Sequence, residues 1–166
     1  MKDIKAYLIK GILFVSLLGT IFHFVYGWSG NNIFVGLFAP INESIWEHTK
    51  LIFFPMLIYS YLERKICAKC PSVKSSIIFG ALCGIWLIIS LFYTYSGIIG
   101  FHFAFADISI FYISVILSFY IAFKKAVSGK ENRHSAILKI LSFIMICLYI
   151  LFTFYQPNIP LFAIPH

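Results

Sequence analysis

Apolar residues run along this chain in five long stretches, and short polar segments separate one stretch from the next. The stretches cover roughly residues 7–27, 43–63, 75–95, 103–123 and 136–155. Each is close to the roughly 20 residues that a helix needs to cross about 30 Å of hydrocarbon. They are apolar on every face, whereas a β-barrel strand alternates apolar and polar positions. The pattern therefore predicts an all-α, polytopic membrane bundle of about five transmembrane helices, with residues 1–166 as a single integral membrane domain.

The segment between the first two stretches is too short to cross a membrane. It reads S-G-N-N-I-F-V-G-L-F-A-P-I, residues 29–41. Its glycine and proline content is typical of a short interfacial or re-entrant outer loop, which is tolerated at membrane depth where protein or a watery cavity covers it. Within the second stretch, Pro55 predicts a kink, because proline removes a backbone hydrogen bond from a helix.

The composition supports a membrane protein and excludes a separate soluble domain. Of the 166 residues, 61% are hydrophobic and only 11% are charged, whereas a soluble domain has about 25% charged residues. So little polar surface cannot cover a chain of this size, and lipid must solvate much of it. Lys2 and Lys5 precede the first stretch as in a secretory signal, but no small-residue cleavage site follows, so we expect a retained first span.

The lysines and arginines predict the orientation. Twelve of the thirteen fall on one side of the predicted bundle, and only Lys50 falls on the other. Because basic loops stay in the cytoplasm, we place the N-terminus inside and the C-terminus outside the cell membrane. The net charge of +7 thus reflects topology, and we expect no nucleic-acid partner. The cytoplasmic cations are Lys2, Lys5, Lys10, Arg64, Lys65, Lys69, Lys74, Lys124, Lys125, Lys130, Arg133 and Lys139.

Two cysteines, Cys67 and Cys70, form a C-A-K-C motif in the first cytoplasmic loop. Such motifs occur in zinc sites and in thiol redox sites, but a structural zinc site needs four ligands and a redox motif needs a βαβ context. Cys83 and Cys147 fall inside apolar stretches, so they do not supply a second pair. Because the cytoplasm is reducing, the sequence favours a reduced pair without a ligand.

Titratable residues gather on the predicted outer side. The densest group is P-I-N-E-S-I-W-E-H-T-K, residues 40–50. On a helix, Glu43 shares a face with Glu47, and Ser44 shares a face with His48. A carboxylate–histidine group of this kind binds a metal or transfers protons. The alternative is an S-x-x-E capping box formed by Ser44 and Glu47, which leaves Glu43 and His48 unexplained.

Asp107 stands about one turn inside the fourth stretch. An isolated carboxylate there costs about 2.5–3.5 kcal/mol, so such a residue is normally paired, protonated or beside a cavity. A functional site is the favoured interpretation, and a neutral acid bonded to Tyr95 is the alternative. If the outer side holds one site, we expect Asp107 within hydrogen-bond or one-water reach of Glu43, Glu47, His48 or a shared ion.

These residues give three sets of site predictions. The predicted catalytic residues are Glu43, Glu47, His48 and Asp107. The predicted substrate-binding residues are Asn42, Ser44, Trp46 and Tyr95. The predicted ligands of a divalent metal such as zinc are His23, His48 and His102, although the sequence has no H-E-x-x-H motif.

Several segments resemble an uncharacterised family of small bacterial membrane proteins that span the membrane several times. The motif N-E-S-x-W-E-H, within the longer segment 23–56, carries the resemblance. Y-S-G-I-I-G at 95–100, D-I-S-I-F-Y-I-S at 107–114 and Q-P-N-I-P-L-F at 156–162 are similar to that family too. The resemblance covers most of the chain and implies a fold and a bacterial origin, but no reaction.

Two functions are compatible with these features, and the sequence does not decide whether the protein is an enzyme. The first is an enzyme acting on a lipid or lipid-linked substrate at the outer leaflet by acid–base or metal-assisted chemistry, which the titratable cluster favours. The second is a non-enzymatic, substrate-binding membrane subunit of an uptake system, which the lack of a nucleophile motif favours. Both imply membrane lipid and a small-molecule or lipid ligand as partners.

Overall fold

The computed structural model describes residues 2–62, 71–128 and 135–165 of the chain. Within these ranges every regular element is helical, which confirms the predicted all-α fold. Five long helices correspond to the five apolar stretches, one short helix lies between the first two of them, and another follows the last. The elements are α1 (Lys2–Trp28), α2 (Ile33–Gly36), α3 (Ile45–Leu62), α5 (Pro71–Ile99), α6 (Ala104–Val127), α7 (Ser135–Phe154) and the 3₁₀ helix η1 (Pro160–Phe162).

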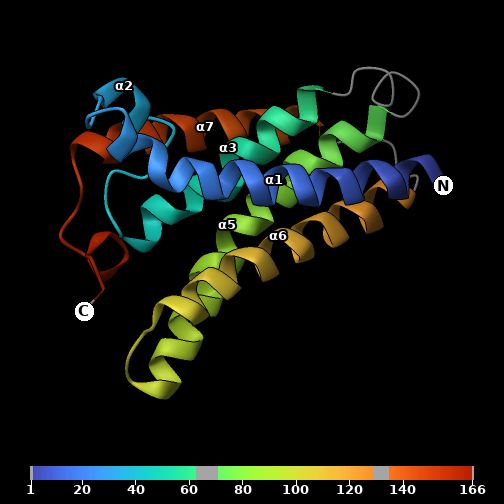
Figure 1. The fold of residues 1–166 in the computed structure, drawn as a ribbon. Helices are drawn as coiled ribbons and strands as arrows, with labels where there is room; N and C mark the ends of the chain where they lie inside the picture. The colour runs from blue at the N-terminus through green and yellow to red at the C-terminus, as the bar shows by residue number, and fades with distance from the viewer. Residues whose placement is uncertain (1, 63–70, 129–134, 166) are drawn as a thin grey trace.

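The long helices form one bundle with α3 at its centre (Figure 1). α3 packs against α1, α5 and η1, and α5 also packs against α6 and α7. Most residues of α3 are buried, including Ile52, Phe53 and Met56, so this helix supplies much of the core. α5 and α6 form a hairpin whose closed end extends beyond the other helices (Figure 1).

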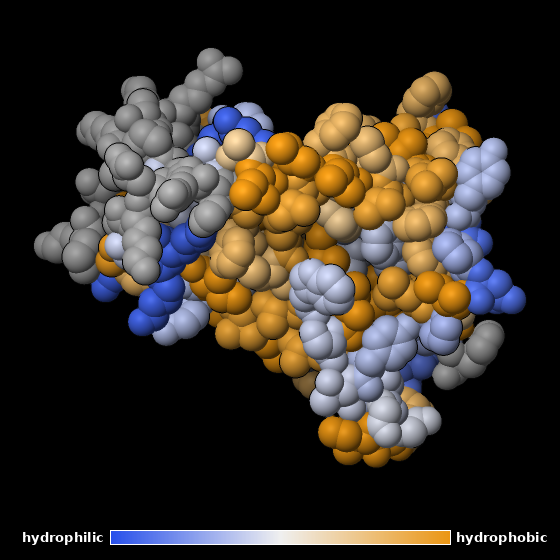
Figure 2. Space-filling model, turned by 180° about the vertical axis from the view of Figure 1, so that it is seen from behind, coloured by the Kyte–Doolittle hydropathy of each residue, from blue (hydrophilic) through white to orange (hydrophobic). Residues whose placement is uncertain are grey.

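Four helices of the described chain are, by length and composition, apolar enough to cross a membrane. Their apolar segments are Ile4–Trp28, Ser72–Ile99, Ala104–Val127 and Ser135–Phe154. Figure 2 shows apolar side chains covering the middle of one face of the molecule, with hydrophilic residues toward its ends. The protein is therefore a helical membrane bundle.

The central helix α3 matches the position of the predicted second span but is not among these four. It runs over Ile45–Leu62, against a predicted 43–63, and Pro55 lies within it. It carries Glu47, His48 and Lys50 in its first turns and buries most of its surface among the other helices. The fifth crossing predicted from the sequence therefore stays a prediction.

Most of the lysines in the described helices belong to elements that meet at one end of the bundle. The N-terminus, the start of α5 and the end of α6 lie at one end, and α2, η1 and the C-terminal residues lie at the other (Figure 1). This grouping separates the segments in the way that the basic residues predicted, and the direction of the bundle in the membrane stays a prediction. The lysines in the elements of the first end are Lys2, Lys5, Lys10, Lys74, Lys124, Lys125 and Lys139.

Several sequence predictions concern residues outside the described ranges, and those predictions stay as stated. They are the loop cations, the C-A-K-C pair and two histidines: Arg64, Lys65, Lys69, Lys130, Arg133, Cys67, Cys70, His134 and His166.

α1 approaches the central helix closely at Gly19. A Cβ atom there would lie 2.6 Å from the carbonyl oxygen of Leu51 and 2.5 Å from the ring of Phe111. Small residues of this kind let membrane helices bring their backbones together. His23 follows one turn later on the same face of α1, so this contact also brings His23 toward α3.

The loop between α1 and α3 is shaped by local hydrogen bonds and tied to the core by one lysine. Gly30 and Asn31 have positive φ angles of 70° and 61°. The side chain of Asn32 then accepts a hydrogen bond of 2.9 Å from the backbone N–H of Phe34, which starts α2. From α3, Lys50 Nζ donates to the carbonyl oxygen of Gly36 at 2.9 Å. The depth of this loop in the membrane stays a prediction.

Candidate functional site

Three side chains with metal-binding atoms meet at the end of the bundle that carries α2. They are His23 from α1, Glu43 from the loop before α3, and His48 from α3. Glu43 Oε2 lies 3.2 Å from His48 Nε2 and 3.6 Å from His23 Nε2. The two Nε2 atoms are 3.4 Å apart. All three ligand atoms thus fall within 4.8 Å of one another, close enough for one ion to contact each of them.

A hydrogen bond made by Nδ1 of His48 orients the ring so that its other nitrogen, Nε2, faces the cluster. His48 Nδ1 lies 2.9 Å from the carbonyl oxygen of Ser44, four residues earlier in the chain. A carbonyl only accepts, so Nδ1 must carry the proton to make this bond. In the neutral ring Nε2 then carries a lone pair that can bind a cation, and in the protonated ring Nε2–H donates to Glu43 Oε2 at 3.2 Å. A backbone carbonyl that orients an imidazole in this way is a common support for a metal ligand.

Glu43 lies before the first turn of α3, outside the helices, and its side chain is 63% exposed. The hydrogen bond from His48 lowers the pKa of this carboxyl below its usual value, and the charges of His48 and His23 act in the same direction. Partial burial opposes this effect by raising the pKa. Glu43 is therefore an ionised carboxylate that can reach solvent, and such a group can bind a cation.

Glu47 does not join this cluster, although we expected it to share a face with Glu43. It forms a buried ion pair with Lys50, with 2.7 Å between Glu47 Oε2 and Lys50 Nζ, and both side chains are 0% exposed. The same carboxylate oxygen accepts the backbone N–H of Ile41 at 3.0 Å. Lys50 also donates to Thr153 of α7 at 2.8 Å. The pair therefore holds the loop, α3 and α7 together and lies away from any open surface.

The start of α3 contains half of the predicted capping box. Ser44 Oγ accepts the backbone N–H of Glu47 at 3.4 Å, as a cap should. The reciprocal bond is made by Asn42, whose Oδ1 accepts the backbone N–H of Ser44 at 3.0 Å. Asn42 also donates to Gln156 at 3.0 Å, and Trp46 is buried against aromatic rings of α7 and η1. Three of the predicted substrate-binding residues, Asn42, Ser44 and Trp46, thus have structural contacts.

Asp107 belongs to a second cluster, formed at the closed end of the α5–α6 hairpin. Tyr95 donates a hydrogen bond to Asp107 Oδ1, and His102 Nδ1 lies 3.0 Å from Asp107 Oδ2. In the described part of the chain, no hydrogen bond or ion pair joins Asp107 to Glu43, Glu47 or His48. The direct contact expected for a single site is therefore not seen.

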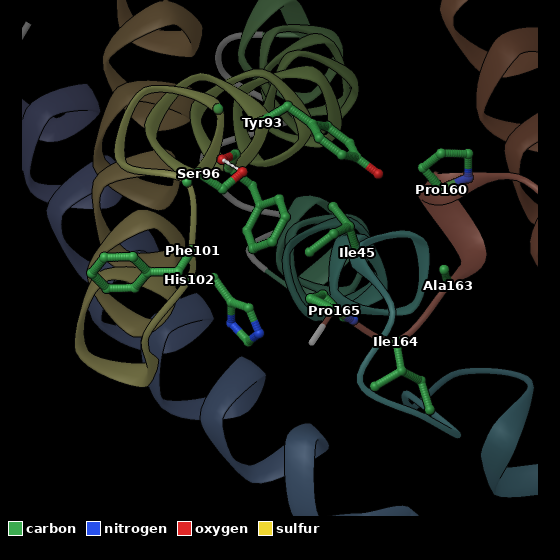
Figure 3. Close-up of a pocket in the computed structure, with 12 residues that line it drawn as sticks. Ile45, Tyr93, Ser96, Phe101, His102, Pro160, Ala163, Ile164 and Pro165 are labelled. Atoms are coloured by element: carbon green, nitrogen blue, oxygen red, sulfur yellow. Dashed lines mark hydrogen bonds between the residues drawn. The ribbon is translucent and has the colours of Figure 1, made fainter.

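His102 also lines a pocket of about 420 Å³. The pocket lies between the end of α5, the first residue of α3 and the segment around η1 (Figure 3). In this view the hydroxyl of Tyr93 points toward Pro160, while the ring of His102 lies near Pro165. Most of the lining is apolar, and it includes Ile45, Phe92, Phe101, Pro160, Ala163 and Ile164.

Of the three histidines predicted to bind a metal, the structure brings His23 and His48 together and places His102 in the second cluster. Glu43, predicted as a catalytic residue, takes the third position. The Glu47–Lys50 pair has a signal in the sequence, because residues three apart lie on one helix face. Thr153 lies 103 residues from its partner Lys50, and no local pattern could have revealed it.

Comparison with known proteins identifies the family and leaves the reaction open. No curated protein and no solved structure was found to match the chain. A family model matches residues 1–164, which confirms the expected membership of an uncharacterised family. The bacterial origin and the N-E-S-x-W-E-H motif as a family mark stay predictions. The chain therefore belongs to the family of unknown function DUF6512.

Proposed function

We propose that this protein is a metal-dependent enzyme that acts on a lipid or lipid-linked substrate at the outer face of the cell membrane. The observation that carries the proposal is the meeting of His23, Glu43 and His48. Two histidines and one glutamate are a ligand set of catalytic zinc sites, which keep a fourth position open for water or substrate.

The spacing of the ligand atoms supports binding of one tetrahedral ion. Zinc holds histidine nitrogen and carboxylate oxygen at about 2.0–2.1 Å, so two ligands of one tetrahedral ion lie about 3.3 Å apart. The separations here are 3.2, 3.4 and 3.6 Å. Two imidazole nitrogens that face each other at such a distance need either a proton or a cation between them.

The surroundings of the cluster support chemistry on a substrate in addition to ion binding. Glu43 is exposed, so the fourth position of an ion would be open. A bound zinc ion polarises a carbonyl or phosphoryl oxygen and lowers the pKa of a bound water. The chain's own contribution is to hold the ion through His23, Glu43 and His48. His102 and Asp107 add a separate acid–base pair near the same end of the bundle.

A second candidate function is a substrate-binding membrane subunit of an uptake system. The observation that favours it is the largely apolar pocket beside His102, which can hold a ligand without any reaction. In that case the histidine–glutamate cluster would be a hydrogen-bonded group without a metal.

Zinc titration of the purified protein tests the proposal. We expect protein treated with a chelator, in detergent micelles, to bind about one zinc ion per chain. Loss of an outer-shell partner alone weakens metal binding by about 10–100-fold, so removal of a ligand in His23→Ala or His48→Ala should weaken it further.

The matched control is His102→Ala, which removes a histidine of the second cluster. This variant should bind zinc as the unchanged protein does, because His102 is paired with Asp107 and not with Glu43. An equal loss in all three variants, or no stoichiometric zinc in the unchanged protein, would overturn the proposal. A co-purified small molecule without metal would support the uptake subunit.

A further inference from the structure

We infer that the pocket beside His102 binds a fatty-acyl chain, with the imidazole of His102 at the carbonyl end of that chain. This inference names the substrate class of the enzyme proposed above and rests on that proposal for the reaction. The binding of the acyl chain is argued from the pocket alone.

The size and lining of the pocket suit a hydrocarbon chain. Its volume of about 420 Å³ lies within the range of about 300–1,000 Å³ that is usual for ligand sites. Phe92, Phe101, Ile45 and Ile164 are among the side chains that line it. Such side chains gain more from contact with an alkyl chain than from contact with water.

The pocket lies beside apolar surface that we expect to face lipid. It opens at the closed end of the hairpin formed by α5 and α6, and both helices are apolar enough to cross a membrane. Around that end, the large side chains of Ile98, Ile99 and Phe103 are exposed. A lipid chain can therefore enter the pocket from the membrane without first crossing water.

The imidazole of His102 and the hydroxyl of Tyr93 supply polar groups to the pocket, and the imidazole is held in a fixed orientation. Asp107 Oδ2 holds His102 Nδ1 at 3.0 Å, and Tyr95 donates to the other carboxylate oxygen. A carboxylate that binds one ring nitrogen fixes the orientation and the tautomer of the imidazole. In the described part of the chain, His102 Nε2 has no hydrogen-bond partner. In the imidazolium form, which pairs with the Asp107 carboxylate, Nε2–H can donate to a carbonyl oxygen of the ligand.

The charge of the lining favours a carboxyl or ester group over a phosphate. Phosphate groups are usually bound by arginine or lysine, and neither residue lines the pocket. Lys50 is buried and paired with Glu47, so it is not available to a ligand. Ser96 already donates its hydroxyl to the carbonyl oxygen of Phe92 at 2.8 Å. The imidazole of His102 and the hydroxyl of Tyr93 are hydrogen-bonding groups that suit the carbonyl end of an acyl group.

Photo-crosslinking tests this inference. The protein in lipid nanodiscs is incubated with a long-chain fatty acid that carries a photoreactive group on its chain, and the labelled peptides are mapped by mass spectrometry. We expect the label in the peptides that contain Phe92–Phe101 and Pro160–Pro165. Label spread evenly over all lipid-facing helices would overturn the inference.

Two glycines give a matched pair of variants. Gly97 lines the pocket and Gly27 lies near the end of α1, and a Cβ atom at either position would meet no other group within 4 Å. Gly97→Phe should fill the pocket and reduce its labelling by roughly tenfold, which corresponds to about 1.4 kcal/mol. Gly27→Phe should leave the labelling unchanged. Equal labelling of both variants would contradict the inference. If Gly97→Phe does not fold, the positions of the labelled peptides in the unchanged protein decide whether the inference holds.

The head group and the metal give the remaining readouts. A fatty acid of equal chain length should compete for the label better than the matching alkyl phosphate, and the reverse order would contradict an acyl site. Zinc binding by Gly97→Phe should equal that of the unchanged protein. Zinc without pocket labelling would refute this inference and leave the metal proposal standing. Labelling of the pocket in a protein that binds no zinc would support this inference and overturn the metal proposal.

Discussion

At the scale of single residues, Glu43 makes the stability of the folded protein depend on pH. Its pKa is lowered mainly by the hydrogen bond from His48, so it lies below the ordinary value of 4.5. A group with a lowered pKa in the folded state stabilises the protein above its ordinary pKa, and this contribution is lost as the pH falls through the lowered value. We expect Glu43→Gln to lower the melting temperature of the metal-free protein near neutral pH and to lose this effect well below pH 4.5. A difference that stays constant down to acidic pH would contradict this account.

The buried pair of Glu47 and Lys50 makes a second prediction at this scale. Removing one partner leaves an unpaired charge in the core, which costs about 3–5 kcal/mol. Lys50→Met alone should therefore destabilise the protein strongly, as measured by thermal unfolding in detergent. The double variant with Glu47→Gln should recover much of the loss, because the orphaned carboxylate is removed. Additive losses would show that the two side chains are not coupled.

At the scale of helices, the contact between α1 and α3 should control the metal cluster. A Cβ atom at Gly19 would come within 2.6 Å of the Leu51 carbonyl oxygen, so Gly19→Ala must push α1 away. His23 lies one turn further along α1, and we expect this variant to lower both zinc affinity and melting temperature. Gly27→Ala, where the added methyl meets open space, is the control and should change neither. Equal zinc affinity in both variants would argue against placement of His23 by this contact.

The helices themselves could be predicted well, but the start of α3 could not be placed to the residue. The apolar runs fixed the number of long helices, because lipid requires about 20 apolar residues for each crossing. The predicted second span began at residue 43, whereas α3 begins at Ile45. This small shift leaves Glu43 outside the helix, so it no longer shares a face with Glu47. The Glu43 side chain contacts the two histidines, and the Glu47 side chain pairs with Lys50.

Contacts between side chains of different helices could not be predicted from the sequence, because the apolar pattern does not show how the helices are rotated against one another. His23 and His48 are 25 residues apart, and only the packing of α1 on α3 brings them together. The pairing of Asp107 with Tyr95 was foreseen as an alternative, since a carboxylate at a helix start needs a nearby donor. Its second partner, His102, was expected to bind a metal instead.

At the scale of the whole molecule, the orientation in the membrane is a prediction from the basic residues. Asn31 lies in the loop at the end of the bundle that carries α2, and Lys125 lies near the end of α6 at the opposite end. In a variant without its own cysteines, an impermeant thiol reagent added to intact cells should label Asn31→Cys and spare Lys125→Cys. The reverse pattern would move the metal cluster to the cytoplasmic side and exclude an enzyme of the outer leaflet.

The claim that His23, Glu43 and His48 hold a metal ion is tested most directly by X-ray absorption at the zinc edge of the zinc-loaded protein. The account predicts nitrogen and oxygen ligands at about 2.0–2.1 Å, with a contribution from two imidazoles that falls to one in His23→Ala. Sulfur ligands at about 2.3 Å would place the ion on cysteines instead. A sulfur shell, or a spectrum that His23→Ala and His48→Ala leave unchanged, would contradict the account.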